Sequence, residues 1–162
     1  MGLGRRLQNH PRLLARAYQA AHWFALRLGP VVHRAGAERI GRWLAPPEEL
    51  GKRWIFDCRM CGQCVLHSTG MTCPMTCPKN LRNGPCGGVR ADGSCEVHAQ
   101  LRCVWVEAYE RSQAMTTYAG DLALLQPPLD RRLEGSSAWI NLITGADRVA
   151  SHGWGDDRET PS

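Results

Sequence analysis

The apolar residues in the first forty positions recur with the period of a helix. They are three or four residues apart, which places them in a single stripe along one side of a helix. Alanine, leucine and arginine are frequent here, and all three favour helix formation. The stripe consists of Leu13, Ala17, Ala20, Phe24 and Leu28.

Glycine and proline pairs set the expected ends of these helices. We expect helical structure between residues 4 and 45, interrupted at Gly29-Pro30, because this pair usually marks a turn. A second helix is expected from about Val31 to Leu44, and Pro46-Pro47 is expected to end it. The sequence therefore predicts a helical N-terminal arm with two helices.

The pattern after residue 95 predicts one more helix followed by loops. Residues 96 to about 115 read as a helix, in which Glu107 and Arg111 would form an ion pair on the exposed side. From Thr116 the chain is expected to be loop-like. The short apolar run of residues 138–143 is expected to lie over a partner subunit, and the polar end, residues 151–162, to be disordered.

All of the cysteines lie in the middle of the chain, within 46 of its 162 residues, which is not the pattern of cysteines scattered for packing. Eight thiols are enough for two sites of four, the number that iron–sulfur clusters and structural zinc both take. The candidate metal ligands are Cys58, Cys61, Cys64, Cys73, Cys77, Cys86, Cys95 and Cys103.

The cysteine spacing favours an iron–sulfur cluster over zinc. Two intervals of two residues, at Cys58, Cys61 and Cys64, are typical of ferredoxin-like loops, whose fourth cysteine is often followed by proline. Cys73 and Cys77 both precede a proline, so either could be the closing ligand. The second site would use mainly the later cysteines, which lack the closely spaced pairs of zinc modules. Zinc remains the alternative there, and a disulfide framework is disfavoured.

Other residues between the cysteines could assist a metal site. The backbone N–H groups of Gly87 and Gly88 are candidates to donate to cluster sulfurs. His67 and His98 are weaker candidates, each able to replace a thiolate. Four cations could balance the charge of the thiolates, although ordinary surface charge explains them equally well: Arg59, Lys79, Arg82 and Arg90.

The excess positive charge belongs to the N-terminal arm alone. The chain has a net charge of +5, and residues 1–50, with eight arginines and three glutamates, account for all of it. We expect the arm to dock its apolar stripe on a partner subunit. Packing against its own cysteine region and lying on a membrane surface are the alternatives. A nucleic-acid partner is disfavoured, because no nucleic-acid-binding motif is present.

Several classes of function are excluded or disfavoured by missing motifs. The sequence has no phosphate-binding glycine loop, no serine nucleophile elbow and no alternation of strands and helices that could hold a flavin or a folate. We therefore do not expect the chain to catalyse a reaction alone. No apolar run is long enough to span a membrane and no export signal is evident, so a cytoplasmic location is expected.

The motifs around the cysteines resemble one family closely. They read Cys-x2-Cys-Gly-x-Cys, Cys-Pro-x2-Cys-Pro-Lys-Asn, Arg-Asn-Gly-Pro-Cys-Gly-Gly, Asp-Gly-x-Cys-Glu-Val and Cys-Val-Trp. These motifs are similar to those of the methylenetetrahydrofolate reductase C-terminal domain family, which includes MetV-type small subunits. The resemblance covers residues 54–109 and resumes at 127–130 and 135–141. Residues 1–50 are expected to lie outside it.

The resemblance implies a function that the spacing alone does not give. It implies an electron-transfer and assembly subunit that carries one or two [4Fe-4S] clusters, with zinc in the second site as an alternative. The subunit would dock on the flavin-containing catalytic subunit of a methylenetetrahydrofolate reductase, and a further redox protein could join them. A structural zinc scaffold without a redox role is the other hypothesis.

The expected fold is small, irregular and α-rich, and stapled by metal. It would comprise a basic helical arm (1–50), a ferredoxin-like eight-cysteine metal-binding module (51–116) and a loop-rich C-terminal segment (117–162), with a helix in the module and an extended tail.

Overall fold

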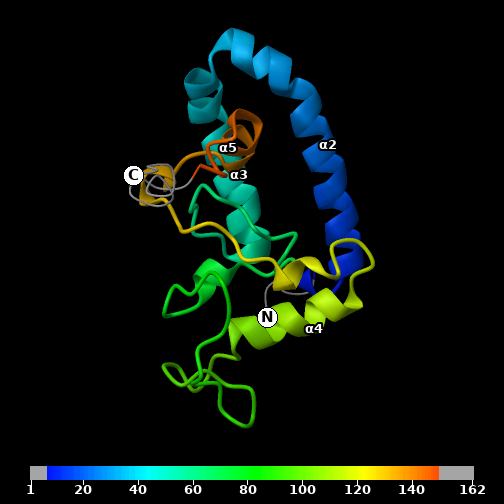
Figure 1. The fold of residues 1–162 in the computed structure, drawn as a ribbon, viewed down its shortest axis with the longest axis vertical. Helices are drawn as coiled ribbons and strands as arrows, with labels where there is room; N and C mark the ends of the chain where they lie inside the picture. The colour runs from blue at the N-terminus through cyan, green and yellow to red at the C-terminus, as the bar shows by residue number, and fades with distance from the viewer. Residues whose placement is uncertain (1–6, 150–162) are drawn as a thin grey trace, which may run out of the picture.

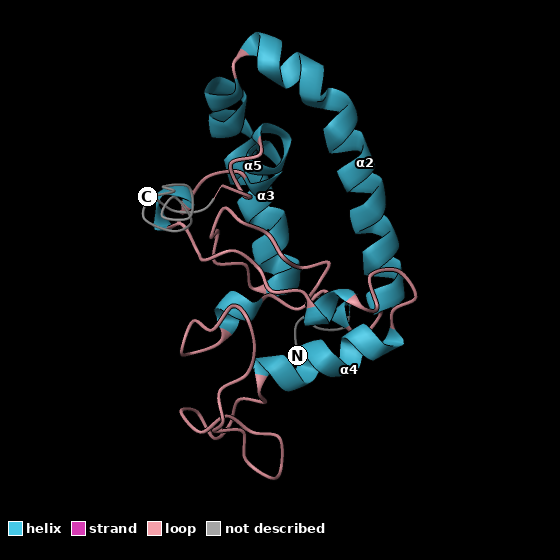
Figure 2. Ribbon diagram, viewed as in Figure 1, coloured by secondary structure: helices cyan, strands magenta, loops and turns pink. Residues whose placement is uncertain are grey.

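The protein is built from helices joined by long loops. A computed structural model of the chain describes residues 7–149 (Figure 1). Within that range there are four α-helices and three short 3-10 helices, and no strand, only two isolated β-bridges between residues 89 and 102 (Figure 2). The expected α-rich class is confirmed. Residues 4–6 of the expected first helix and the end expected to be disordered, 151–162, lie outside the described range.

The N-terminal arm is a helical hairpin. Helix α2 (Pro11–Ala35) and helix α3 (Ala37–Phe56) meet at Gly36, whose φ of 92° lies in the region that glycine adopts most readily (Figure 1). One residue thus reverses the chain and places α3 beside α2. The turn was expected at Gly29-Pro30, and it lies six residues beyond Pro30.

The expected break at Gly29-Pro30 is wrong, because α2 continues through both residues. Proline removes one intrahelical hydrogen bond, but tertiary packing can outweigh that local cost. Gly29 is buried, and its α-carbon faces Ile143, so close packing against the C-terminal helix is available at this point. Packing therefore holds the helix together across the proline.

The expected helix end at Pro46-Pro47 is also wrong, since α3 continues to Phe56. The turn that follows the two prolines carries Glu48, which is buried and hydrogen-bonded to the start of another helix. This anchoring favours the helical path beyond the prolines. Helix α3 consequently runs across residues 50 and 51, where we had placed the boundary between arm and module.

Helix α2 has two apolar faces, and the interior uses the one that we did not predict. Ala15, Ala25 and Val32 are buried against the rest of the chain. The expected stripe lies on the outer side instead, where Phe24 is 58% exposed and Leu13 61%. The arm therefore packs against its own chain, the alternative expectation, and leaves the predicted stripe uncovered within the described residues.

Helix α4 (Val104–Ala114) begins eight residues later than expected. Residues 94–102 instead form a turn, in which Cys95 N–H donates to the Leu101 carbonyl at 2.8 Å. The predicted Glu107–Arg111 ion pair is present at 3.4 Å, but both side chains are more than two-thirds covered, so it is not on an exposed side.

The short apolar run near the C-terminus forms helix α5 (Ala138–Thr144). Ser137 caps it by accepting a hydrogen bond from Ile140 N–H at 3.3 Å. The helix packs against both α2 and α3, and Ile140 is buried there. The expected loop is therefore wrong here, because the run is a helix that packs within the chain, while its contact with a partner subunit stays a prediction.

The main core joins the arm to the cysteine loops. Its buried members come from α2, from the segment between residues 66 and 75, and from the residue that follows α4. Three methionines among them provide adaptable side chains that fill space between irregular loops. The buried residues are Ala15, Leu66, Met71, Cys73, Met75 and Met115.

Candidate metal centre

Four of the eight cysteines line one small cavity. Cys58, Cys61 and Cys64 reach it from the loop after α3, and Cys73 reaches it from the residue before the 3-10 helix η1 (Pro74–Thr76). Lys52 and Glu48 of α3 lie at the same cavity. The structure thus places Cys73, and not Cys77, beside the first three thiols.

The loop from Cys58 to Cys64 owes its path to left-handed backbone positions. Met60 and Gly62 have φ values of 47° and 74°. A Cβ at Gly62 would overlap the carbonyl oxygen of Leu133, which packs against the loop. Glycine is therefore required at position 62 both by the backbone and by its neighbour.

Hydrogen bonds link two of the thiols directly. Cys73 donates to Cys58, and this bond lowers the pKa of Cys58 to about 6, with the Met60 N–H, 3.3 Å from its sulfur, and Lys52 contributing. The same bond and burial raise the pKa of Cys73. In the metal-free protein Cys58 is therefore the member of the pair that ionises first.

Lys52 is a functional candidate that the sequence analysis missed. Its ammonium lies 2.5 Å from Glu48 and 5.1 Å from the centre of the Trp139 ring, with 12% of the side chain exposed. Burial works against its charge, but Cys64 and Glu48 outweigh burial and raise its pKa. The i,i+4 spacing of Glu48 and Lys52 could have revealed this ion pair. It was not considered because the helix was expected to end at Pro46-Pro47, before both residues.

Arg82 is the second cation near the four thiols. It is buried, lies 3.9 Å from the Cys61 sulfur and donates to the Gln63 carbonyl at 2.7 Å. The other expected cations have different partners: Arg59 pairs with Asp57, Lys79 with Glu96, and Arg90 donates to the Glu96 carbonyl.

The remaining cysteines do not line the four-cysteine cavity. The Cys86 sulfur is 3.6 Å from a Glu96 oxygen, Cys95 takes part in a β-bridge with Val89, and Cys103 is buried at the start of α4. Cys77 lines a separate surface pocket beside Cys61. A second site of four thiols stays a prediction.

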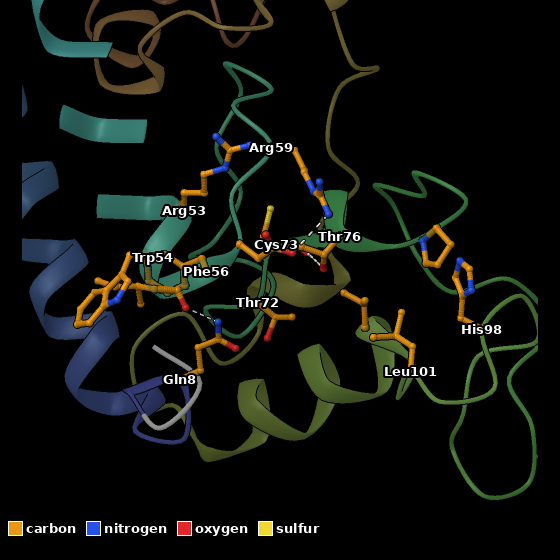
Figure 3. A pocket seen from close by; sticks show the side chains of 14 residues that line it. Gln8, Arg53, Trp54, Phe56, Arg59, Thr72, Cys73, Thr76, His98 and Leu101 are labelled. Atoms are coloured by element: carbon orange, nitrogen blue, oxygen red, sulfur yellow. Dashed lines mark hydrogen bonds and ion pairs between the residues drawn. The ribbon is translucent and has the colours of Figure 1, made fainter. Parts of the chain in front are cut away.

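The other candidate ligands also lie elsewhere. Gly87 is exposed, and Gly88 packs against the Glu96 carboxylate. His67 stacks on Tyr18, with ring centres 5.6 Å apart, and burial lowers its pKa. His98 lines a surface pocket of about 600 Å³, which also includes Trp54 and Cys73 (Figure 3). Cys73 thus lies between the four-cysteine cavity and an open pocket.

Among residues 7–149, no three histidine, cysteine, aspartate or glutamate side chains are arranged to hold a single metal ion. The cavity between the four thiols has a volume of about 20 Å³, room for about one water molecule. Within the same range, no helix is both long and apolar enough to cross a membrane.

The fold and site define a helix-rich protein with a cysteine-lined cavity beneath a helical hairpin. Residues 40–132 match the family described as methylene-tetrahydrofolate reductase C terminal. This match covers more than half of the chain, so the chain belongs to that family, and the resemblance is confirmed. The match includes residues 40–50, which we had placed outside. Comparisons with curated proteins and with solved structures found no match.

Proposed function

We propose that the chain is an iron–sulfur subunit of a methylenetetrahydrofolate reductase complex, with its cluster held by Cys58, Cys61, Cys64 and Cys73. The observation that carries this proposal is the convergence of these four thiols on one cavity. Membership of the reductase family associates the chain with that enzyme. Such a cluster, when bound, exchanges single electrons.

The residues around the thiols suit a cluster of negative charge. Lys52 and Arg82 are cations with largely covered side chains, and each lies beside cysteine residues of the set. The Met60 N–H already points at a thiol sulfur. Cations and N–H donors near the sulfurs favour the reduced, more negative state of a cluster and raise its reduction potential.

The donor set favours a cluster over a single zinc ion. Two intervals of two residues, followed by a cysteine that precedes proline, are typical of loops that bind a cluster, and this is the spacing of Cys58, Cys61, Cys64 and Cys73. A cluster spreads its thiolates around the corners of a cube. Because Cys58 and Cys73 are hydrogen-bonded to each other in the metal-free protein, these two thiols would have to separate to admit it. The alternative is a structural zinc scaffold without a redox role, and metal analysis distinguishes the two.

We further propose that the outer stripe of α2 docks on the flavin-containing catalytic subunit. The stripe consists of the five positions defined above, and it lies on the side of α2 away from the buried residues. An apolar helix face combined with exposed arginines, such as Arg16 and Arg27, fits an apolar groove with an acidic rim.

The proposal is tested by measuring iron, sulfide and zinc in the chain purified anaerobically with its catalytic subunit. We expect about four iron and four sulfide per occupied cluster, and Cys61→Ser should remove the cluster bound at the cavity. Cys86→Ser is the matched control and should leave that cluster in place. Zinc alone, without iron or sulfide, would show that the site is a structural zinc scaffold.

A further inference from the structure

A second cavity lies on the far side of the cysteine loop. It has a volume of about 170 Å³, is partly open to solvent, and is lined by residues of α2, of the loop and of the segment after α5. Cys64 lines both this cavity and the four-cysteine cavity.

This cavity collects polar atoms that have no partner. Within the described residues, three buried side-chain polar atoms lack a hydrogen bond: His67 Nδ1, Arg82 Nε and Asp147 Oδ1. All three residues line the same cavity. Because native proteins leave few buried polar groups unpaired, such a convergence points to a bound molecule.

In the described part of the chain, Arg82 and Asp147 do not form an ion pair with each other. The guanidinium of Arg82 uses another nitrogen to donate to the Gln63 carbonyl, at 2.7 Å. The backbone carbonyl of Asp147 accepts from the Gln63 amide at 3.1 Å, which fixes this residue at the cavity without satisfying its carboxylate. Burial raises the pKa of Asp147, although Arg148, Arg82 and His22, which line the same cavity, act in the opposite direction.

The walls of the cavity are aromatic and held in place. Tyr18 stacks on His67, and Tyr118 meets the edge of His67 with ring centres 5.5 Å apart. A volume of about 170 Å³ equals the share of about five or six water molecules in the liquid. The site is therefore preformed and suits a ligand with about that number of non-hydrogen atoms.

We propose that this cavity binds a small zwitterion of the α-amino-acid class. The ligand ammonium would donate to Asp147 Oδ1 and His67 Nδ1, and the ligand carboxylate would accept from Arg82 Nε. The Arg82 and Asp147 side chains would then each face a group of opposite charge, which is the condition for covering charges at low cost.

The charge pattern argues against simpler ligands. An anion such as acetate would satisfy Arg82 but would bring a second negative charge next to Asp147. A cation such as methylammonium would satisfy Asp147 and leave Arg82 unpaired. Water would supply hydrogen bonds without balancing either charge.

The test is calorimetric titration of the full-length chain with glycine, L-alanine and L-serine, and separately with acetate and methylammonium. We expect saturable binding of one amino acid molecule per chain, and binding of either single-charge probe weaker by about tenfold or more, since each lacks one charge-assisted hydrogen bond. Asp147→Asn should weaken amino-acid binding by a similar factor. Glu110→Gln, which removes a carboxylate from the exposed surface of α4, should have no effect.

Three results would overturn the proposal. No saturable binding of any of the three amino acids would leave water as the occupant. If acetate bound as tightly as the amino acids, the cavity would be a plain anion site. Equal binding by the Asp147→Asn variant, shown to be folded by circular dichroism, would remove the carboxylate from the site. The comparison of probes on the unaltered chain decides the question even if the variant does not fold.

Discussion

At the scale of single residues, the path of the cysteine loop depends on one position. Gly62 combines a left-handed backbone with a close approach to the Leu133 carbonyl. The cysteine spacing marked the loop, and the Cys-Gly pair within it was visible in the sequence. That the loop would meet residue 133 was not, because nothing local links two segments about seventy residues apart.

We expect Gly62→Ala to destabilise the protein by about 2–4 kcal/mol, which combines the cost of a left-handed alanine with that of overpacking. Urea unfolding followed by circular dichroism measures this difference. Gly51→Ala is the matched control, because Gly51 lies exposed in α3 with no neighbour near its α-carbon. There alanine should raise stability by about 0.5–1 kcal/mol. A Gly62→Ala variant as stable as the parent would contradict the assigned packing.

The shared hydrogen bond of Cys58 and Cys73 predicts unequal reactivity in the reduced, metal-free chain. Alkylation requires the thiolate, and the pKa of Cys58 is lowered to about 6. Its alkylation should therefore accelerate as pH rises through about 6, while Cys73, whose pKa is raised, stays slow. The same shift stabilises the fold above the unfolded thiol's pKa, and this contribution is lost as pH falls through about 6.

Peptide mass spectrometry after timed iodoacetamide treatment measures both rates. Cys73→Ala removes the hydrogen-bond donor and should move the Cys58 profile to higher pH. A Cys58 profile centred at the usual cysteine pKa of about 8.5 in the unaltered chain would refute the shared bond.

At the scale of elements, helix α2 carries the predicted apolar stripe, but a different face of the helix packs against the rest of the chain. The stripe of apolar residues was recognised, but a second set at Ala15, Ala25 and Gly29 is small and drew no attention. Small residues allow close packing on this face: Gly29 approaches Ile143 of α5, and Ala15 lies in the core with the cysteine loops. The exposed stripe then stays available to a partner.

Replacing part of the stripe should weaken assembly without unfolding the chain. For Phe24→Ser combined with Leu28→Ser, we expect the affinity for the catalytic subunit to fall by about tenfold or more, because large apolar contacts are lost. Surface plasmon resonance with the immobilised catalytic subunit measures this loss. Leu125→Ser is the control, since Leu125 is equally apolar and exposed but lies in a loop and not in the stripe. Unchanged affinity would place the interface elsewhere, and a lowered melting temperature would show that the stripe is structural.

At the scale of the whole molecule, the sequence predicted only features that depend on residues close together in the chain. Helical periodicity and the cysteine run could be recognised within short windows. The partners of Glu48 could not, because this carboxylate accepts from Ser137 and Ala138, about ninety residues away. The helix ends were misplaced for the same reason, as contacts with distant segments outweighed the local signals of proline.

The family match ends at residue 132, yet two features of the structure depend on residues outside it. Trp139 covers Lys52, and Tyr18 forms a wall of the second cavity. The arm and α5 therefore add to the shared cysteine region a covered cation and a cavity that the matched segment does not contain by itself.

The second cavity has walls from opposite ends of the chain, Tyr18 in α2 and Asp147 after α5. During synthesis, Asp147 leaves the ribosome long after α2, so the cavity is complete only when residues 18–147 have all been made and folded. A molecule that occupies it would hold α2 and the segment after α5 together, and would distinguish chains folded through residue 147 from those that are not.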